Sequence, residues 1–169
     1  TEIYTLSLHD ALPICSTQGI GLAAAQELAR LGARVTLLAR DPNKLGAALS
    51  TLDKSAAQEH LVLIADMSDT SALQHAIEKH VKVNGAITIL INNTGGPPPG
   101  LAHDAPISAF EAAFRLHLLA FQTLMLAIVP GMKATGGGRI INVISTSVKQ
   151  PLNGLGVSNT IRGAVANWS

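Results

Sequence analysis

The chain has 169 residues, 47% of them hydrophobic and 14% charged, which suits one globular domain with a sizeable core. Its 12 basic and 11 acidic residues leave a net charge of +1, so neither the basic surplus of nucleic-acid-binding proteins nor an acidic disordered tail is present. A single cysteine, short apolar runs and an N-terminus unlike a signal peptide favour a cytoplasmic protein with no membrane partner.

Helix and strand patterns alternate along the chain from residue 19. In chain order, the predicted elements are a helix over 21–32, a strand over 33–40, a helix over 42–52, a strand over 61–67, a helix over 70–84, a strand over 86–92, a helix over 108–130, a strand over 136–145 and a helix from 158. Gly32 suits a helix end, Asp41 suits a helix cap before Pro42, and either Asp69 or Thr70 can cap the third helix.

Fully apolar strands that alternate with helices predict an α/β fold of the Rossmann type. In this doubly wound arrangement a parallel sheet carries helices on both faces. Residues 4–14, YTLSLHDALPI, alternate only weakly, and His9, Asp10 and Pro13 are poor strand residues. We therefore expect the sheet to lack a genuine first strand.

The stretch CSTQGIG, residues 15–21, predicts a glycine-rich turn into the first helix. Gly19 and Gly21 allow a sharp turn and a close approach of the backbone to a ligand. In a doubly wound sheet, this turn and the helix N-terminus bind a pyrophosphate group. Taken alone, two glycines with this spacing also fit an ordinary tight turn.

Four segments together resemble the short-chain dehydrogenase/reductase family. CSTQGIG is similar to its TGxxxGIG loop, INNTGG at 91–96 to its NNAG motif, and GRIINVIS at 138–145 to the strand that carries its catalytic serine. Asp66 ends a strand where the family places an aspartate against the adenine. The resemblance covers about residues 15–169. Since family members are longer, it implies that the last strands, the lid and most of the substrate pocket are absent.

The resemblance implies a nicotinamide-nucleotide site at the strand ends. Its residues would be Cys15, Ser16, Thr17, Gln18, Gly19, Ile20, Gly21, Arg40, Asp66, Met67, Asn93, Thr94, Gly95 and Arg162. The position of the acid that binds NAD falls on Ala39, and Arg40 follows it. A guanidinium suits the 2′-phosphate of NADP, so NADP (NADPH) is favoured over NAD. The alternative is that Arg40 is merely a solvated strand-end residue.

The catalytic positions implied by the resemblance are largely substituted. The serine position falls on Ser145, whereas the asparagine, tyrosine and lysine positions fall on His117, Ser158 and Arg162. A serine hydroxyl is a poor general acid near pH 7, but Arg162 keeps a charge that could hold the nicotinamide ribose. His117 suits acid–base chemistry or core packing, and Lys149 could donate a proton or stand in solvent.

Two functions therefore stay open. One is an NADP-dependent oxidoreductase acting on a small carbonyl or alcohol substrate, of which this chain is an inactive fragment. The other is a non-catalytic NADP-binding relative that acts as a sensor or scaffold. Apolar faces of the helices over 108–130 and from 158 suit a homo-oligomer, and the histidines lack metal-ligand spacing.

Residues 1–14, TEIYTLSLHDALPI, resemble the in-frame translation of a common sequencing adapter. Cys15 stands where the family has its first loop glycine, and a T joined to the last two bases of a GGC codon gives the cysteine codon TGC. We therefore expect residues 1–14 to be non-native and residues 15–169 to be a partial NAD(P)-binding Rossmann domain. The alternative is a genuine N-terminal strand of unusual sequence.

Overall fold

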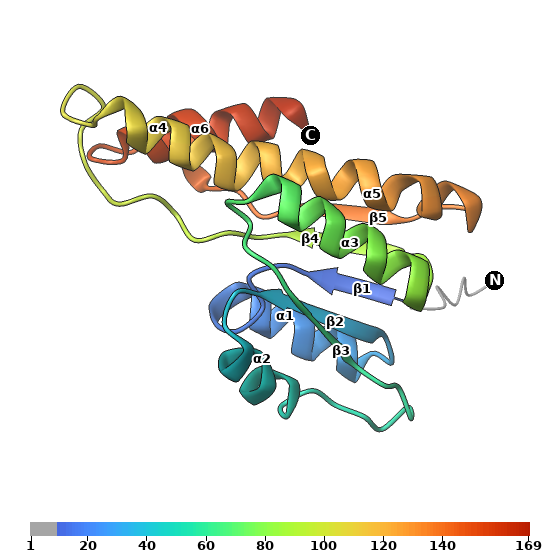
Figure 1. Cartoon of the computed structure of the whole chain (residues 1–169). Helices are drawn as coiled ribbons and strands as arrows, with labels where there is room; N and C mark the ends of the chain where they lie inside the picture. Colours follow the sequence, from blue (N-terminus) through green and yellow to red (C-terminus); the bar gives the residue numbers. More distant parts are fainter. Residues whose placement is uncertain (1–9) are drawn as a thin grey trace, which may run out of the picture.

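The computed structural model describes residues 10–169, which form one parallel sheet flanked by helices (Figure 1). The strands are β1 (Asp10–Pro13), β2 (Arg34–Ala39), β3 (Leu61–Ile64), β4 (Ile89–Asn92) and β5 (Arg139–Asn142). They lie in the order β3-β2-β1-β4-β5, and every neighbouring pair is parallel. The chain therefore reverses its winding between β1 and β4, where ligands bind in folds of this class.

Helices cover both faces of the sheet, as the sequence predicts. The helices are α1 (Gly19–Arg30), α2 (Pro42–Leu49), α3 (Thr70–Asn84), α4 (Ile107–Phe114), the π-helix η1 (Arg115–Leu119), α5 (Ala120–Ala134), the 3₁₀ helix η2 (Thr146–Val148) and α6 (Gly156–Trp168). Leu37 packs in one core cluster with α1 and α2, whereas its neighbour Leu38 packs in another with α3, α5 and α6. Because successive strand residues point to opposite faces, the two clusters lie on opposite sides of the sheet.

The expectation that the sheet lacks a first strand is wrong. Residues Asp10–Pro13 form β1 in the middle of the sheet, paired with β2 on one side and β4 on the other. Ala11 and Leu12 are buried, and Ile14 donates its N–H to Ile91 O at 3.0 Å. Burial and pairing on both sides outweigh the weak strand propensity of this segment.

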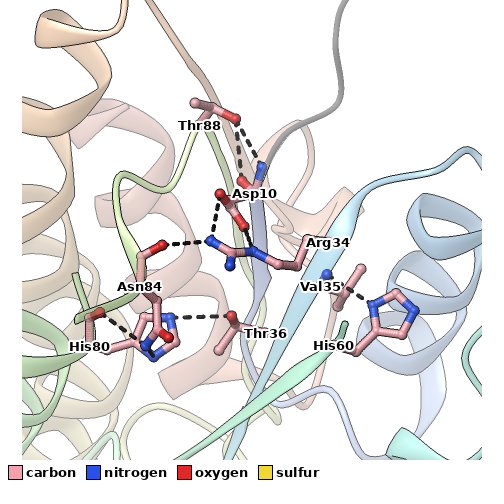
Figure 2. Close-up of polar contacts among 8 residues, drawn as sticks. All are labelled: Asp10, Arg34, Val35, Thr36, His60, His80, Asn84 and Thr88. Atoms are coloured by element: carbon pink, nitrogen blue, oxygen red, sulfur yellow. Dashed lines mark hydrogen bonds and ion pairs between the residues drawn. The ribbon is translucent and has the colours of Figure 1, made fainter. Parts of the chain in front are cut away.

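The structure accommodates the charged residue and the proline of β1, Asp10 and Pro13, at the two ends of the strand. The Asp10 carboxylate pairs with the guanidinium of Arg34, which also donates to Asn84 O at 2.6 Å (Figure 2). Pro13 is the last residue of the strand. Residues 1–9 lie outside the described residues, so the adapter origin of residues 1–14 stays a prediction.

The predicted caps and several boundaries are confirmed, although three strands are shorter than predicted. Asp41 accepts hydrogen bonds from Asn43 N and Lys44 N and caps α2, and Asp69 caps α3 through Ala72 N. The strands predicted over 61–67, 86–92 and 136–145 are each four residues long in the structure. The remaining residues of these three predicted ranges lie outside the paired strands and form loop.

Among the described residues, one helical run has the length and composition to cross a membrane. It covers Ile107–Ala134 at a mean hydropathy of 1.7, which the short apolar runs of the sequence did not indicate. Phe121, Leu124 and Ile128 on this run are buried in the core that contains α3. About a third (33%) of its most apolar window is buried, so core packing accounts for part of its apolar character.

Candidate functional site

A cleft of about 1110 Å³ lies at the carboxyl ends of β1, β2, β3 and β4. Its lining includes most of the predicted cofactor residues, namely Cys15, Thr17, Gln18, Gly19, Ile20, Arg40, Asp66, Met67, Asn93, Thr94 and Gly95. Residues along α4 and η1 also line it. Ser16, Gly21 and Arg162 do not line the cleft. A cleft at a topological switch point suits an elongated ligand such as a dinucleotide.

The N-terminus of α1 faces this cleft without a side-chain cap. Gln18 stands at the N-cap but makes no capping hydrogen bond, and the first turn holds no acidic residue. Gly19 adopts a φ of 57°, which glycine tolerates at no steric cost. The first helical N–H groups are therefore left for an anion such as a pyrophosphate.

Gly21 lets α1 pack against the end of β1. A Cβ at this position would lie 2.6 Å from Cys15 O and 3.0 Å from Asn93 Nδ2, closer than side-chain carbons approach. Because Gly21 has no side chain, α1 can pack closely against the end of β1. This packing brings the N-terminus of α1 to the cleft.

Cys15 occupies a backbone conformation that favours glycine. Its φ is 49°, in the left-handed region that side chains other than Asn and Asp rarely enter. This supports the expectation that a glycine belongs at this position. Burial raises the pKa of the Cys15 thiol, so the group stays protonated near neutral pH.

Ser16 faces the sheet rather than the cleft. Its side chain is fully buried, and Oγ accepts a hydrogen bond from Leu38 N at 3.0 Å. Its own N–H donates to Leu38 O at 3.4 Å. Ser16 therefore ties the glycine-rich turn to β2, and its side chain is not placed to contact a cofactor in the cleft.

Cationic and anionic side chains meet at the end of the cleft near β2 and β3. Arg40 Nη1 lies 3.6 Å from Asp66 Oδ2, and three quarters of the Arg40 side chain (75%) is exposed. Hydrogen bonds from Ser68 lower the pKa of the Asp66 carboxyl group, which therefore stays ionised. Lys44, four residues after Arg40 and in the first turn of α2, also lines this end.

Lys44 is a lining residue that the sequence reasoning missed. Its spacing from Arg40 was a usable signal, because a helix that starts at Pro42 turns its first residues back toward the strand end. Two cations and the uncapped N–H groups of α1 in the same cleft give it the charges that a phosphorylated dinucleotide requires.

The two serines at implied catalytic positions lie outside the cleft lining. Ser145 is half-buried, and its Oγ accepts a hydrogen bond from Ser147 N at 3.1 Å at the start of η2. Ser158 is buried on α6. Lys149, which follows η2, is exposed. All three residues follow β5 in the chain, and β5 lies three places from β2, the strand that precedes Arg40.

His117 and Arg162, also at implied catalytic positions, both contact Thr94. His117 Nδ1 shares a hydrogen bond with Thr94 Oγ1, and Arg162 Nη2 donates to Thr94 O at 3.0 Å. Arg162 Nη1 donates to Val143 O at 2.9 Å. Burial, followed by the Arg162 charge, lowers the pKa of His117 to about 4, so its imidazole is neutral at pH 7. Burial also lowers the pKa of Arg162.

Within residues 10–169 no group of three or more histidine, cysteine, aspartate or glutamate side chains is placed to hold a metal ion.

A family model described as short chain dehydrogenase matches residues 11–168. "Dehydrogenase/reductase SDR family member 4" of Bos taurus is 30% identical over 156 residues, which cover 92% of this chain and 56% of that protein. The crystal structure of L-sorbose reductase from Gluconobacter frateurii, complexed with NADPH and L-sorbose, matches at 29% identity and a TM-score of 0.88. That match covers 95% of this chain and 61% of the reductase.

A third relative is a short chain oxidoreductase from Pseudomonas aeruginosa PAO1, described as containing an atypical catalytic center. It matches at 25% identity and a TM-score of 0.88, over 98% of this chain and 63% of its own. The chain thus spans a little over half to about two thirds of the length of these relatives.

Proposed function

Because the chain belongs to the short chain dehydrogenase family, we propose that it is the nucleotide-binding part of an NADP-dependent oxidoreductase. The observation that carries this proposal is a single cleft lined by Arg40, Lys44 and the uncapped N-terminus of α1. The cations suit a 2′-phosphate, and the N–H groups suit the pyrophosphate. When bound, the nicotinamide supplies or accepts a hydride.

The residues at the second strand end favour NADP over NAD. Ala39 stands where an acid would bind the 2′-hydroxyl of NAD, and the exposed guanidinium of Arg40 follows it. Asp41 is engaged as the cap of α2, so its carboxylate is not free to take the place of that acid. The NADPH complex of the related sorbose reductase supports this assignment.

We propose that the whole protein acts on a small carbonyl or alcohol compound, as the related L-sorbose reductase does. Ser145 would hold the substrate oxygen. Residues 10–169 contain no tyrosine, so a side chain of another kind would donate the proton. A cytoplasmic location and a homo-oligomer formed through the long helices belong to the same proposal.

A non-catalytic NADP-binding protein is the second candidate. The observation that favours it is the engagement of His117 and Arg162 with Thr94 and Val143, behind the cleft. The Pseudomonas aeruginosa relative, described as having an atypical catalytic center, favours the oxidoreductase, because an altered center occurs in that related fold. Both candidate functions use the same proposed nucleotide site.

Binding of NADPH and NADH to this chain tests the proposal directly. Isothermal titration of the two nucleotides should give an affinity for NADPH at least about tenfold higher than that for NADH. Arg40→Ala should weaken NADPH by about tenfold or more and leave NADH nearly unchanged. Equal losses for both nucleotides would show that Arg40 does not read the 2′-phosphate.

Turnover separates the two candidate functions. NADPH oxidation would be followed at 340 nm with a panel of ketones, aldehydes and ketoses, in a longer form of the protein where one is available. Tight binding with oxidation supports the oxidoreductase. Tight binding without oxidation of any compound supports the sensor or scaffold.

A further inference from the structure

Thr94 is held at both of its polar groups by side chains from two other elements. Its hydroxyl is hydrogen-bonded to His117 of η1, and its carbonyl accepts from Arg162 of α6. Thr94 itself lines the cleft, two residues after the end of β4. The two anchoring residues lie far from it in sequence, by 23 and 68 positions.

The His117 side chain has no other hydrogen-bond partner within the described part of the chain. The residue is fully buried, and its Nε2 has no hydrogen-bond partner. The edge of its ring packs against the Phe121 ring, with the ring centroids 6.3 Å apart. Thr94 is thus the one hydrogen-bond partner of this side chain among the described residues, and His117 itself does not line the cleft. It is therefore placed to orient Thr94 rather than to exchange protons with a substrate.

The Arg162 guanidinium is hydrogen-bonded to backbone carbonyl groups. Its two terminal nitrogens donate to carbonyls at the ends of β4 and β5, and no carboxylate of the described residues pairs with it. A buried guanidinium shared between two strand ends holds these ends at a fixed separation.

We propose that His117 and Arg162 are positioning residues that anchor Thr94 and thereby fix the loop 93–96 against the nucleotide. This inference rests on the proposed NADP site. Residues 93–96 all line the cleft, and Gly95 and Gly96 give the loop a high conformational entropy when it is free. Fixing it before the ligand arrives lowers the cost of binding. Positions 117 and 162 thus contribute to affinity for the nucleotide.

The structure offers a matched control at the opposite end of the sheet. Thr36 Oγ1 of β2 is hydrogen-bonded to His80 Nε2 of α3 at 3.2 Å, and both residues are buried (Figure 2). Neither residue lines the cleft. Removing the Thr36 hydroxyl therefore removes the same kind of contact from the core without touching the nucleotide site.

The test compares NADPH dissociation constants and unfolding temperatures for Thr94→Val, Thr94→Ser, His117→Leu, the double variant with Thr94→Val, and Thr36→Val. Thr94→Val and His117→Leu should each weaken NADPH by about tenfold, and the double variant by no more than either alone. Thr94→Ser keeps the hydroxyl and should bind within about twofold of the parent protein. Thr36→Val should lower the unfolding temperature and leave NADPH affinity unchanged.

A second measurement keeps the test decisive if His117→Leu fails to fold. Amide hydrogen exchange of residues 93–96 in the free protein should be faster in Thr94→Val, and not in Thr94→Ser or Thr36→Val. Unchanged NADPH affinity and unchanged exchange in Thr94→Val would overturn the inference, while NADPH binding by the parent protein would leave the proposed function intact. A parent protein that does not bind NADPH would overturn both.

Discussion

Acidification should destabilise this chain through His117. In the unfolded chain the imidazole has its usual pKa of 6.5, whereas burial and the Arg162 charge lower the pKa in the folded chain to about 4. The folded state therefore resists protonation of this side chain. The stability that depends on its neutral form is complete above pH 6.5 and is lost as the pH falls toward 4.

The size of the loss follows from the two pKa values. At pH 5 about 97% of unfolded chains and about 10% of folded chains carry a proton on this imidazole, which lowers the free energy of unfolding by roughly 2 kcal/mol relative to pH 7. Urea denaturation followed by circular dichroism at pH 7 and pH 5, at constant ionic strength, measures this loss. His117→Asn removes the titrating group and should lose roughly 2 kcal/mol less than the parent chain.

His80 supplies the control, because burial and then the Arg34 charge also lower the pKa of its imidazole. His80→Gln should reduce the acid sensitivity independently of His117→Asn, because the two histidines share no hydrogen-bond partner. Thr36, the partner of His80, lies on β2, and Thr94, the partner of His117, follows β4 on the other side of β1. If His117→Asn and the parent chain lose the same free energy between pH 7 and pH 5, the imidazole is not the buried neutral group described above.

Three further substitutions test other features of the site. Cys15→Gly should raise the free energy of unfolding by about 0.5–1 kcal/mol, because glycine adopts a positive φ without strain; no gain in the denaturation midpoint would argue against strain at this residue. Gly21→Ala should weaken NADPH binding and lower the unfolding temperature, because its Cβ would meet Cys15 O at 2.6 Å; calorimetric titration and a thermal melt measure both, and normal values would mean that α1 can shift freely. Ser145→Ala should lower carbonyl turnover of a catalytically active form about 100-fold and leave NADPH affinity unchanged, and unaltered turnover would remove this hydroxyl from the chemistry.

The regular part of the fold could be predicted from local patterns. Strands that are buried on both faces are apolar throughout, so β2 and β4 stand out against the amphipathic helices between them. β1 could not be found in this way, since Asp10 and Pro13 oppose strand formation locally. What makes the segment a strand is its position between two others, and the local sequence does not encode that position.

The candidate site was predictable to the extent that single segments build it. The glycine-rich turn, Arg40 and Asp66 each follow a strand, and parallel strands bring their carboxyl ends together. The pairing of Thr94 with His117 depends on how η1 packs over β4, which no local pattern encodes. For the same reason Ser16, inside the predicted phosphate loop, proved to bond to β2.

The central position of β1 has a consequence for the order of assembly during synthesis. β1 pairs with β2 after a short stretch of chain, but its contact with the start of β4 joins Asp10 to Thr88, 78 positions apart. A ribosome adding roughly 5–20 residues per second makes that stretch in about 4–16 s. Throughout this interval the strand around Leu12 has at least one unpaired edge. The nascent chain is thus most exposed to misassociation before the loop that carries Thr94 has been made.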